Sequence, residues 1–287
     1  MAPIPVGSFR QVFWIRLRGN SSKAMRYRGP FIIPIANMKV LVVDIGGTHV
    51  KVLARGRGRE SFPSGSKLTP KRMVAKVRKL AAYWDYDVVS IGYPGPVSKD
   101  RVVKEPWNLG KGWVGFNFET GFQRPVKLVN DAGLQALGSY GGGKLLFLGL
   151  GTGLGSALIV DGTLVPMELG HLPYKKATFE DYVGIRGLKK YGKQKWRCHV
   201  VDVVQRLIDA LEPEDVVLGG GNVHKLKHLP ARCRGGDNGN ALLGGLRLWT
   251  KGNDLLRQKP DELMPAGNRA NYPGNRKSLL HKMKSLP

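Results

Sequence analysis

Residues 127–155 read KLVNDAGLQALGSYGGGKLLFLGLGTGLG, and this stretch contains the parts that decide the fold. A short apolar run ends in Asn130-Asp131, and a second apolar run, residues 145–150, opens into a glycine-rich turn at residues 151–155. Short apolar runs bounded by turn residues are typical of buried strands. The stretch therefore predicts two strands, one ending in a carboxylate and the other in a run of free backbone N–H groups.

The first half of the chain contains a similar arrangement. Residues 39–44 (KVLVVD) form a continuous apolar run that ends in Asp-Ile-Gly-Gly-Thr, and residues 50–54 read as the partner strand of a hairpin. A strand, a glycine turn and a strand therefore occur near Asp44 and again near Gly151. Because strands alternate with helical patterns, the sequence predicts two α/β domains with a cleft between them.

The other elements follow from local signals. Thr69-Pro70 is a helix-start signal before apolar residues at helical spacing. Residues 104–118 are rich in Gly, Trp and Asn, which suits a loop over a cleft. The remaining predicted elements are a strand at 88–92 closed by the rigid turn 93–96, a hairpin of 157–160 with 163–165, helices at 179–195, 200–211 and 241–249, and a strand at 216–218.

Composition limits the possible classes of protein. With 287 residues, 42% of them hydrophobic, the chain can build two modest domains with proper cores. The formal net charge of +25 favours a polyanionic partner, which could be nucleic acid, an acidic membrane or a phosphate-rich molecule. No apolar run approaches the roughly 20 residues of a membrane span. Cys198 and Cys233 lack CxxC spacing, which favours a reduced cytoplasmic protein without a cysteine-rich zinc site.

The two ends of the chain read differently from its middle. Residues 1–37 contain no Asp or Glu, and beyond about residue 252 the chain is rich in Pro, Asn, Lys and Arg. The first segment resembles a transit peptide in composition, or it is a basic flexible extension. The predicted plan is a basic flexible N-terminal extension (1–37), a smaller N-terminal α/β domain (38–132), a larger C-terminal α/β domain (133–252) and a basic flexible tail (253–287).

Two glycine turns are candidate phosphate sites. In the first, Gly46 and Gly47 permit positive φ and close approach, Thr48 offers a hydroxyl, Asp44 could orient a hydrated Mg²⁺, and Lys51 could neutralise phosphate. A tight hairpin with a buried aspartate cap explains the same residues.

The second turn, Gly151-Thr152-Gly153, fits neither the dinucleotide spacing nor a Walker A sequence. These mismatches argue against a Rossmann dehydrogenase and a P-loop NTPase. Two phosphate-type turns after buried strands favour a phosphate ligand.

Several side chains could carry chemistry. Asp131 is a candidate general base, although it could equally be the N-cap of the helix that follows. Glu168 and His171 would be a metal pair on a helix, but Pro166 and Gly170 favour a loop. In a loop, the pair could hold a polyhydroxylated ligand, or His171 could simply be solvated.

A basic cluster follows in the second half of the chain. Its cationic and aromatic members could track a polyanion, or they could be the solvated face of a helix. The members are Lys189, Lys190, Tyr191, Lys193, Lys195, Trp196 and Arg197.

In order and spacing, the motifs resemble those of sugar kinases of the ROK family, and most closely its polyphosphate glucokinases. The likeness runs from Lys39 to about Trp249. The motifs that carry it are Asp44-Ile-Gly-Gly-Thr48 with Lys51, Tyr93-Pro-Gly-Pro96, Asn130-Asp131-Ala132, Leu150-Gly-Thr-Gly-Leu-Gly155, Leu164-Val-Pro166, Glu168-Leu-Gly-His171 and Leu218-Gly-Gly-Gly221. The resemblance implies the two-domain actin-like ATPase (ribonuclease H-like) fold of the sugar kinase type, with an interdomain cleft.

The resemblance also implies roles for residues. Asp131 falls at the catalytic base, and Asp44 at a Mg²⁺ site that holds the ion through water. The sugar-binding positions are Asn108, Asn130, Glu168, His171 and Glu180. The phosphate and nucleotide positions are Asp44, Gly46, Gly47, Thr48, Lys51, Gly151, Thr152, Gly153, Gly220 and Gly221. Many relatives carry a cysteine-rich zinc loop after the Glu-x-Gly-His motif, but here Leu-Pro-Tyr-Lys-Lys follows His171, so no structural zinc is expected.

The expected function is a cytoplasmic, homodimeric hexose kinase. It would transfer a phosphoryl group from polyphosphate, ATP or both to the 6-hydroxyl of glucose or a related hexose such as mannose, with Mg²⁺ as cofactor. Two alternatives stay open, a protein that binds a polyanion or nucleic acid on a kinase-like fold, and a non-catalytic sugar sensor. Nucleic acid is the less favoured partner because the chain contains no RNA-binding motif.

Overall fold

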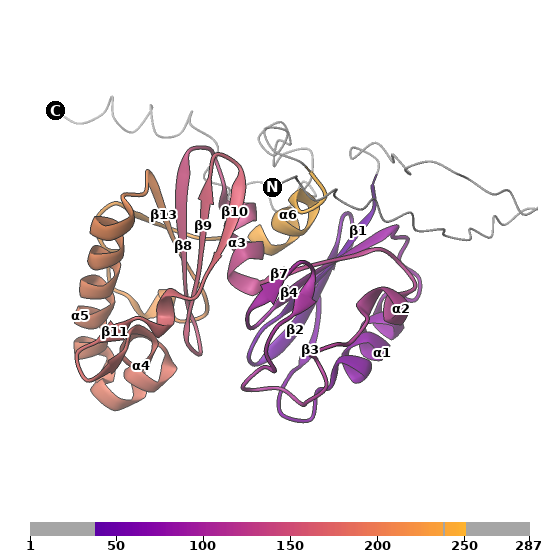
Figure 1. The fold of residues 1–287 in the computed structure, drawn as a ribbon, viewed down its shortest axis with the longest axis horizontal. Helices are drawn as coiled ribbons and strands as arrows, with labels where there is room; N and C mark the ends of the chain where they lie inside the picture. The colour runs from indigo at the N-terminus through magenta and orange to yellow at the C-terminus, as the bar shows by residue number, and fades with distance from the viewer. Residues whose placement is uncertain (1–37, 238, 251–287) are drawn as a thin grey trace, which may run out of the picture. The chain divides into compact units, whose positions relative to one another are not determined.

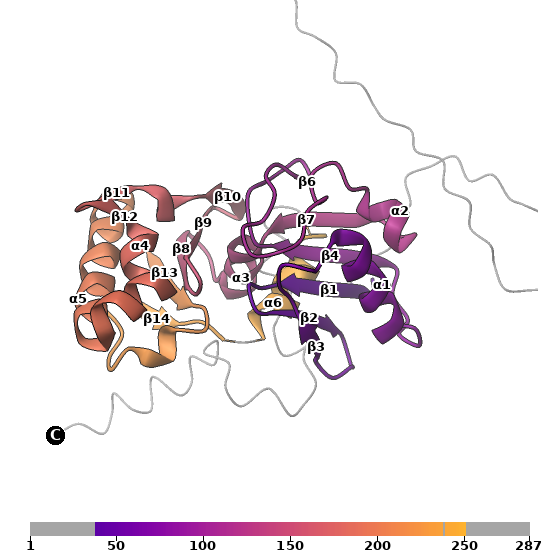
Figure 2. The same cartoon turned by 90° about the horizontal axis from the view of Figure 1, so that it is seen from below.

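The computed structural model describes residues 38–237 and 239–250, which form two five-stranded mixed sheets and the helices that cover them (Figures 1 and 2). The strand order of the first sheet is β3-β2-β1-β4-β7 and that of the second is β10-β9-β8-β13-β14. The first sheet comprises β1 (Val40–Ile45), β2 (His49–Ala54), β3 (Glu60–Pro63), β4 (Val88–Tyr93) and β7 (Val126–Asn130). The second comprises β8 (Lys144–Leu150), β9 (Leu154–Val160), β10 (Thr163–Met167), β13 (Asp215–Gly219) and β14 (Cys233–Gly235).

The two sheets have the same topology. In each, three consecutive strands form an antiparallel meander, a later strand pairs in parallel with the first strand of that meander, and a still later one pairs in parallel with the added strand. The glycine turns occupy equivalent places, because one joins β1 to β2 and the other joins β8 to β9. The predicted repetition of strand, glycine turn and strand is therefore confirmed.

The helices lie between and outside the sheets. They are α1 (Pro70–Leu80), α2 (Phe118–Phe122), α3 (Asp131–Ser139), α4 (Phe179–Val183), α5 (Ile185–Leu211) and α6 (Asn240–Arg247). Short elements complete the described chain: β5 (Val97–Ser98), β6 (Arg101–Val102), β11 (Pro173–Tyr174), β12 (Ala177–Thr178) and the 3₁₀ turns η2 (Leu169–His171) and η3 (Val223–Lys225).

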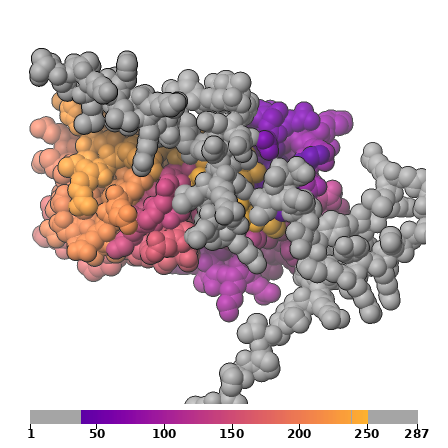
Figure 3. All heavy atoms as spheres, turned by 90° about the horizontal axis from the view of Figure 1, so that it is seen from above, coloured from indigo at the N-terminus to yellow at the C-terminus, as the bar shows by residue number. Residues whose placement is uncertain are grey.

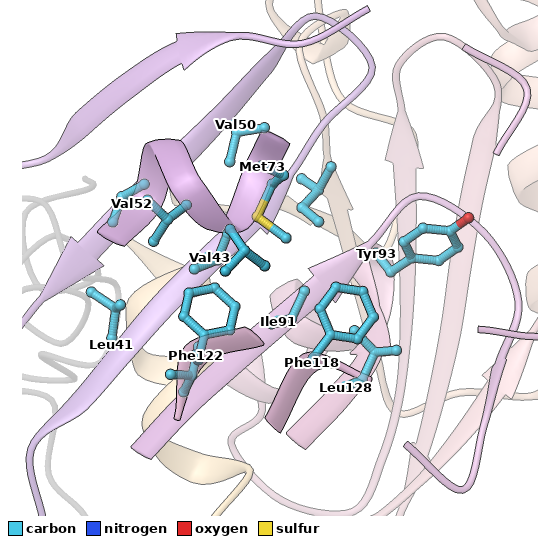
Figure 4. Close-up of a cluster of buried hydrophobic side chains, with 14 of the residues drawn as sticks. Leu41, Val43, Val50, Val52, Met73, Ile91, Tyr93, Phe118, Phe122 and Leu128 are labelled. Atoms are coloured by element: carbon cyan, nitrogen blue, oxygen red, sulfur yellow. The ribbon is translucent and has the colours of Figure 1, made fainter. Parts of the chain in front are cut away.

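One face of the first sheet packs against α1 and α2. The apolar side chains that point to this face alternate along the strands, as the period of two in a strand requires. Val43 and Ile91 meet Met73 of α1 and Phe118 and Phe122 of α2 in one buried cluster (Figure 4). This cluster packs β1 and β4 against the two helices.

The opposite face of the first sheet is covered by α3 and α6, which Figures 1 and 2 show next to one another. Val42 packs with Leu134 of α3 and Leu242 of α6. The buried Ser90 hydroxyl donates to the carbonyl of Gly245 over 2.7 Å. The last helix of the described chain, α6, therefore covers part of this face of the first sheet.

Helix α3 also reaches the second sheet. Its Ala136 packs with Phe147 and Ile159, whereas α5 covers the other face of that sheet, where Val204 joins the cluster around Leu148. In Figure 3 the orange atoms of the segments from α5 to β14 lie directly against the pink atoms of the strands before them. The helix that begins with Asp131 thus contacts both sheets.

Glycine lets α3 and α6 come into backbone contact. A Cβ atom added to Gly244 would fall on the carbonyl oxygen of Leu134, and one added to Gly138 would fall on the carbonyl oxygen of Asn240. Only residues without a side chain fit at these two positions.

The structure differs from the sequence-based expectation in several elements. The strand β3, the helix α2 and the strand β14 were not predicted. The predicted separation between helices 179–195 and 200–211 is wrong, because α5 runs from Ile185 to Leu211 and is interrupted only at Gly192, where φ is 72°. The predicted segments 1–37 and 253–287 lie outside the described residues, and the proposed boundary at 132/133 stays a prediction.

Candidate active site

Asn130 and Asp131 stand where β7 passes into α3. The N-cap of α3 is Asn130, whose side-chain oxygen accepts the Ala132 N–H over 2.8 Å. Its amide nitrogen donates to the Gly95 carbonyl over 3.2 Å. The N-cap interpretation of Asp131 is therefore wrong, and Asp131 occupies the first helical turn instead.

The pKa of the Asp131 carboxyl is far from its ordinary value. Removal from water raises this pKa, the nearby carboxylates of Asp44 and Glu168 raise it further, and together they bring it to about 7 against the opposing effects of the Ala132 N–H and Lys51. A carboxyl with a pKa near neutrality accepts a proton more readily than an ordinary aspartate does. This pKa agrees with the general-base role predicted for Asp131, and that role stays a prediction.

Asp44 lies at the end of β1, beside the same site. Its side chain is buried and accepts Lys51 Nζ over 3.2 Å and Gln135 Nε2 over 3.4 Å. A Cβ atom added to Gly92 of β4 would lie 3.4 Å from both the Asp44 Oδ1 atom and the Asp131 Cα atom. Position 92 thus lies next to both acidic residues, and a Cβ atom there would come within 2.8 Å of Leu134 Cδ2 of α3.

The two glycine turns meet. A Cβ atom on Gly47 would lie 2.8 Å from Thr152 Oγ1 and 3.6 Å from Asn108 Nδ2. Neither Gly46 nor Gly47 adopts a positive φ, so the expectation that these glycines supply positive φ is wrong. The missing Cβ atom of Gly47 instead lets the first turn come close to Thr152 of the second turn. Thr48 is exposed, and its hydroxyl lies 3.3 Å from His49 Nδ1.

Two other segments donate hydrogen bonds to backbone carbonyls of the second turn. The Ile185 N–H donates to the Thr152 carbonyl over 3.1 Å, and Asn222 Nδ2 donates to the Gly151 carbonyl over 2.9 Å. Gly220 adopts φ 87° and lies against the backbone of Leu150. The Gly-Gly-Gly-Asn segment that begins with the last residue of β13 therefore supports this turn, and Gly221 lies in open space beside it.

Three more predicted site residues gather near these groups. Glu168 precedes the 3₁₀ turn that ends at His171, so the predicted loop is a short helical turn. Burial and the Glu180 carboxylate raise the pKa of Glu168, and His171 opposes them. Glu180 lies against Gly153 and pairs with Arg186 over 3.2 Å. Because Glu168 in turn raises the pKa of Asp131, at least this one of the predicted sugar positions lies close to the predicted base.

Sequence reasoning missed several supporting residues. Gln135 is four positions after Asp131 on α3, so helical spacing could have placed it near the site. Asn222 follows a predicted strand and a run of glycines, which is also a readable signal. Glu105 could not have been found, because its carboxylate accepts the backbone N–H groups of Gly112, Trp113 and Val114 within an irregular loop.

Only some residues of the basic cluster are exposed. Trp196 is fully buried and its Nε1 donates to the Val183 carbonyl over 2.8 Å. Arg197 Nε donates to the Lys225 carbonyl over 2.8 Å. The expectation that these two residues track a polyanion is wrong, whereas Lys189, Lys193 and Lys195 are exposed.

Residues 38–237 and 239–250 contain no group of three or more His, Cys, Asp or Glu side chains that could hold a metal ion. No helix in these ranges is both long enough and apolar enough to cross a membrane.

Comparison with known proteins agrees with this architecture. The sequence pattern of the ROK family matches residues 40–187, from β1 into the start of α5. This chain belongs to the ROK family. Inorganic polyphosphate/ATP-glucomannokinase from Arthrobacter sp. strain KM superposes with a TM-score of 0.64 at 25% identity, over 73% of this chain and 97% of that one. The fold of this chain is that of the ROK sugar kinases, the actin-like ATPase fold, as the family resemblance implies.

Among curated ROK relatives, polyphosphate glucokinase from Mycobacterium tuberculosis is 34% identical over 149 residues, which cover 46% of this chain and 56% of that protein. Polyphosphate glucokinase from Mycobacterium leprae is 31% identical over 202 residues, which cover 62% of each. The matched region thus spans less than two thirds of the length of these relatives.

Proposed function

We propose that this ROK protein is a hexose kinase. It transfers a phosphoryl group from polyphosphate, ATP or both to the 6-hydroxyl of glucose or a related hexose such as mannose. One observation carries the proposal: Asp131, with a pKa of about 7, lies near Asp44 at the end of β1 and feels the charges of Glu168 and Lys51. The names of the polyphosphate glucokinase and glucomannokinase relatives support the choice of substrates.

In this proposal Asp131 takes the proton of the attacking hydroxyl. Asn108, Asn130, Glu168, His171 and Glu180 hold the other sugar hydroxyls. The N–H groups of the turns that contain Gly47 and Thr152 face the donor phosphates, and Lys51 contributes a positive charge. These groups stabilise charge that develops on the transferred phosphoryl group, which is the main task in this chemistry.

Mg²⁺ fits the Asp44 side of the site. Mg²⁺ commonly binds through one or two carboxylates together with waters and substrate phosphates, and Asp44 is a buried carboxylate beside a second one, Asp131. We propose that Asp44 holds Mg²⁺ through water. When bound, the ion would neutralise donor phosphate charge.

The test is a matrix of acceptors and donors. Glucose, mannose, fructose and N-acetylated sugars are each incubated with Mg²⁺ and either ATP or polyphosphate, and the 6-phosphate is measured. We expect glucose to react with at least one donor. If no sugar is phosphorylated with either donor, the proposal is wrong. Light scattering on the eluted protein tests the homodimer that we also propose.

A polyanion-binding protein without catalysis is a second candidate, favoured by the net charge of +25. Salt-sensitive binding of RNA or DNA without any sugar turnover would support it. A sugar-induced rise in melting temperature without product would instead indicate a sugar sensor.

A further inference from the structure

The first turns of α5 carry an exposed positive charge that no side chain in the described part of the chain pairs with. Lys189, Lys193 and Lys195 are all exposed. Within residues 38–237 and 239–250, none of the three side chains makes a hydrogen bond or an ion pair. Three unpaired cations within seven residues repel one another, so an anionic ligand would relieve their repulsion.

These lysines start beside the second glycine turn. The Ile185 N–H donates to the Thr152 carbonyl, and a Cβ atom on Gly184 would lie 3.1 Å from the Gly153 Cα atom. Because a helix rises about 1.5 Å per residue, Lys189 lies roughly 6 Å along α5 from this contact. Gly192 then breaks the helix before Lys193. The three lysines therefore lie at increasing distance along the chain from the second glycine turn, to which the proposed function assigns the donor phosphates.

The acidic groups beside this turn are already paired. Arg186 contacts Glu180 over 3.2 Å and Asp181 over 2.9 Å. The carboxylates nearest the start of α5 are therefore offset by Arg186. The charge of Lys189 and of the lysines after it remains available to a ligand.

Three cations spread over seven residues of chain favour a long, unbranched anion as the ligand. A nucleoside triphosphate carries only three phosphates and ends in a nucleoside, whereas linear polyphosphate carries a charge on every unit. We propose that Lys189, Lys193 and Lys195 bind the distal phosphates of a linear polyphosphate whose terminal phosphate lies at the Gly151-Thr152-Gly153 turn. This inference rests on the proposed kinase function and assigns its donor a path along the start of α5.

The test compares donors of different length. A triple variant, Lys189→Gln with Lys193→Gln and Lys195→Gln, is assayed for glucose phosphorylation with ATP, tripolyphosphate and long-chain polyphosphate. We expect the KM for long-chain polyphosphate to rise at least about tenfold at low salt, with a smaller dependence of that KM on salt, because fewer cations contact the chain. The kcat and KM with ATP and with tripolyphosphate stay within about twofold of the wild type.

The matched control removes three exposed lysines of α1, which covers the first sheet: Lys71→Gln, Lys76→Gln and Lys79→Gln. It lowers the net charge equally, and its KM for long-chain polyphosphate should stay near the wild-type value. An equal rise in control and variant would mean that only bulk charge matters and would overturn the proposal. An unchanged KM in the α5 variant, or an equal loss with ATP, would also overturn it.

Direct binding separates this inference from the proposed function. Long-chain polyphosphate is titrated into wild type and variant without sugar, so the affinity can be measured even if no sugar turns over. We expect the variant to bind at least about tenfold more weakly. If single-stranded RNA shows this loss and polyphosphate does not, the surface is a nucleic-acid site and the proposal is wrong.

Discussion

Asp131 is the residue on which the proposed chemistry depends. Replacing it with Asn removes the proton acceptor and keeps the size of the side chain, so we expect kcat to fall by roughly 10²–10⁴-fold while the sugar still binds. Glucose affinity measured by calorimetry should stay within a few-fold of the wild type. A loss of only a few-fold in kcat would remove Asp131 from this role.

The same carboxyl predicts a pH profile. Because the pKa of Asp131 is raised to about 7, the base is protonated in acid and becomes active as the pH rises through neutrality. We expect kcat/KM for glucose to rise between about pH 6 and 8 and then level off. A profile that is flat over this range would contradict the assignment.

Gly47 tests the approach of the two glycine turns. In Gly47→Ala the new Cβ atom would lie 2.8 Å from Thr152 Oγ1, so the Thr152 hydroxyl or one of the turns must move. We expect kcat/KM to fall at least about tenfold, since a displacement of about 1 Å is costly in a positioned site. Gly58→Ala is the control, because nothing lies within 4 Å of that position, and it should leave activity unchanged.

At the scale of elements, the contact between α3 and α6 depends on glycine. A Cβ atom on Gly244 would overlap the Leu134 carbonyl oxygen, so Gly244→Ala must push the helices apart. We expect a loss of about 1–3 kcal/mol or more in the free energy of unfolding, measured with urea. Gly141→Ala, with open space around it, should change it little, and equal losses in both variants would refute the packing argument.

The strands that position the site could be predicted from sequence, because runs such as residues 39–44 and 145–150 are continuously apolar. The element β3 could not, since three of its four residues are exposed and no apolar run marks it. The break in α5 was misplaced because the decisive feature is the single backbone conformation of Gly192. The spacing of hydrophobic residues does not predict the backbone conformation of a single glycine.

In the candidate site too, some features could be predicted from the sequence and others could not. The glycine turns and Asp131 stand directly after predicted strands, so their convergence could be anticipated. The role of Asn130 as N-cap was assigned to its neighbour, because both residue types are good caps and only backbone geometry separates them. Contacts such as Asn222 with the Gly151 carbonyl join distant segments, and a local pattern does not contain them.

At the scale of the whole molecule, Asp131 links folding stability to pH. A carboxyl whose pKa is higher in the folded state contributes stability below its unfolded value of 3.8, and this contribution is lost as the pH rises through about 7. Between pH 4 and 8 the wild type should therefore lose up to about 4 kcal/mol relative to Asp131→Asn. Urea unfolding at several pH values measures the difference. Asp161→Asn, in the turn between β9 and β10, is the control and should run parallel to the wild type.

The position of α6 affects how the chain folds during synthesis. The face of the first sheet that carries Val42 is covered partly by α6, which leaves the ribosome long after the strands of that sheet. Until then, part of this apolar face stays exposed to solvent and to other nascent chains, a state that favours aggregation. Translation that stops before Asn240 would therefore release a product whose first sheet is only partly covered, and we expect chaperones to bind it.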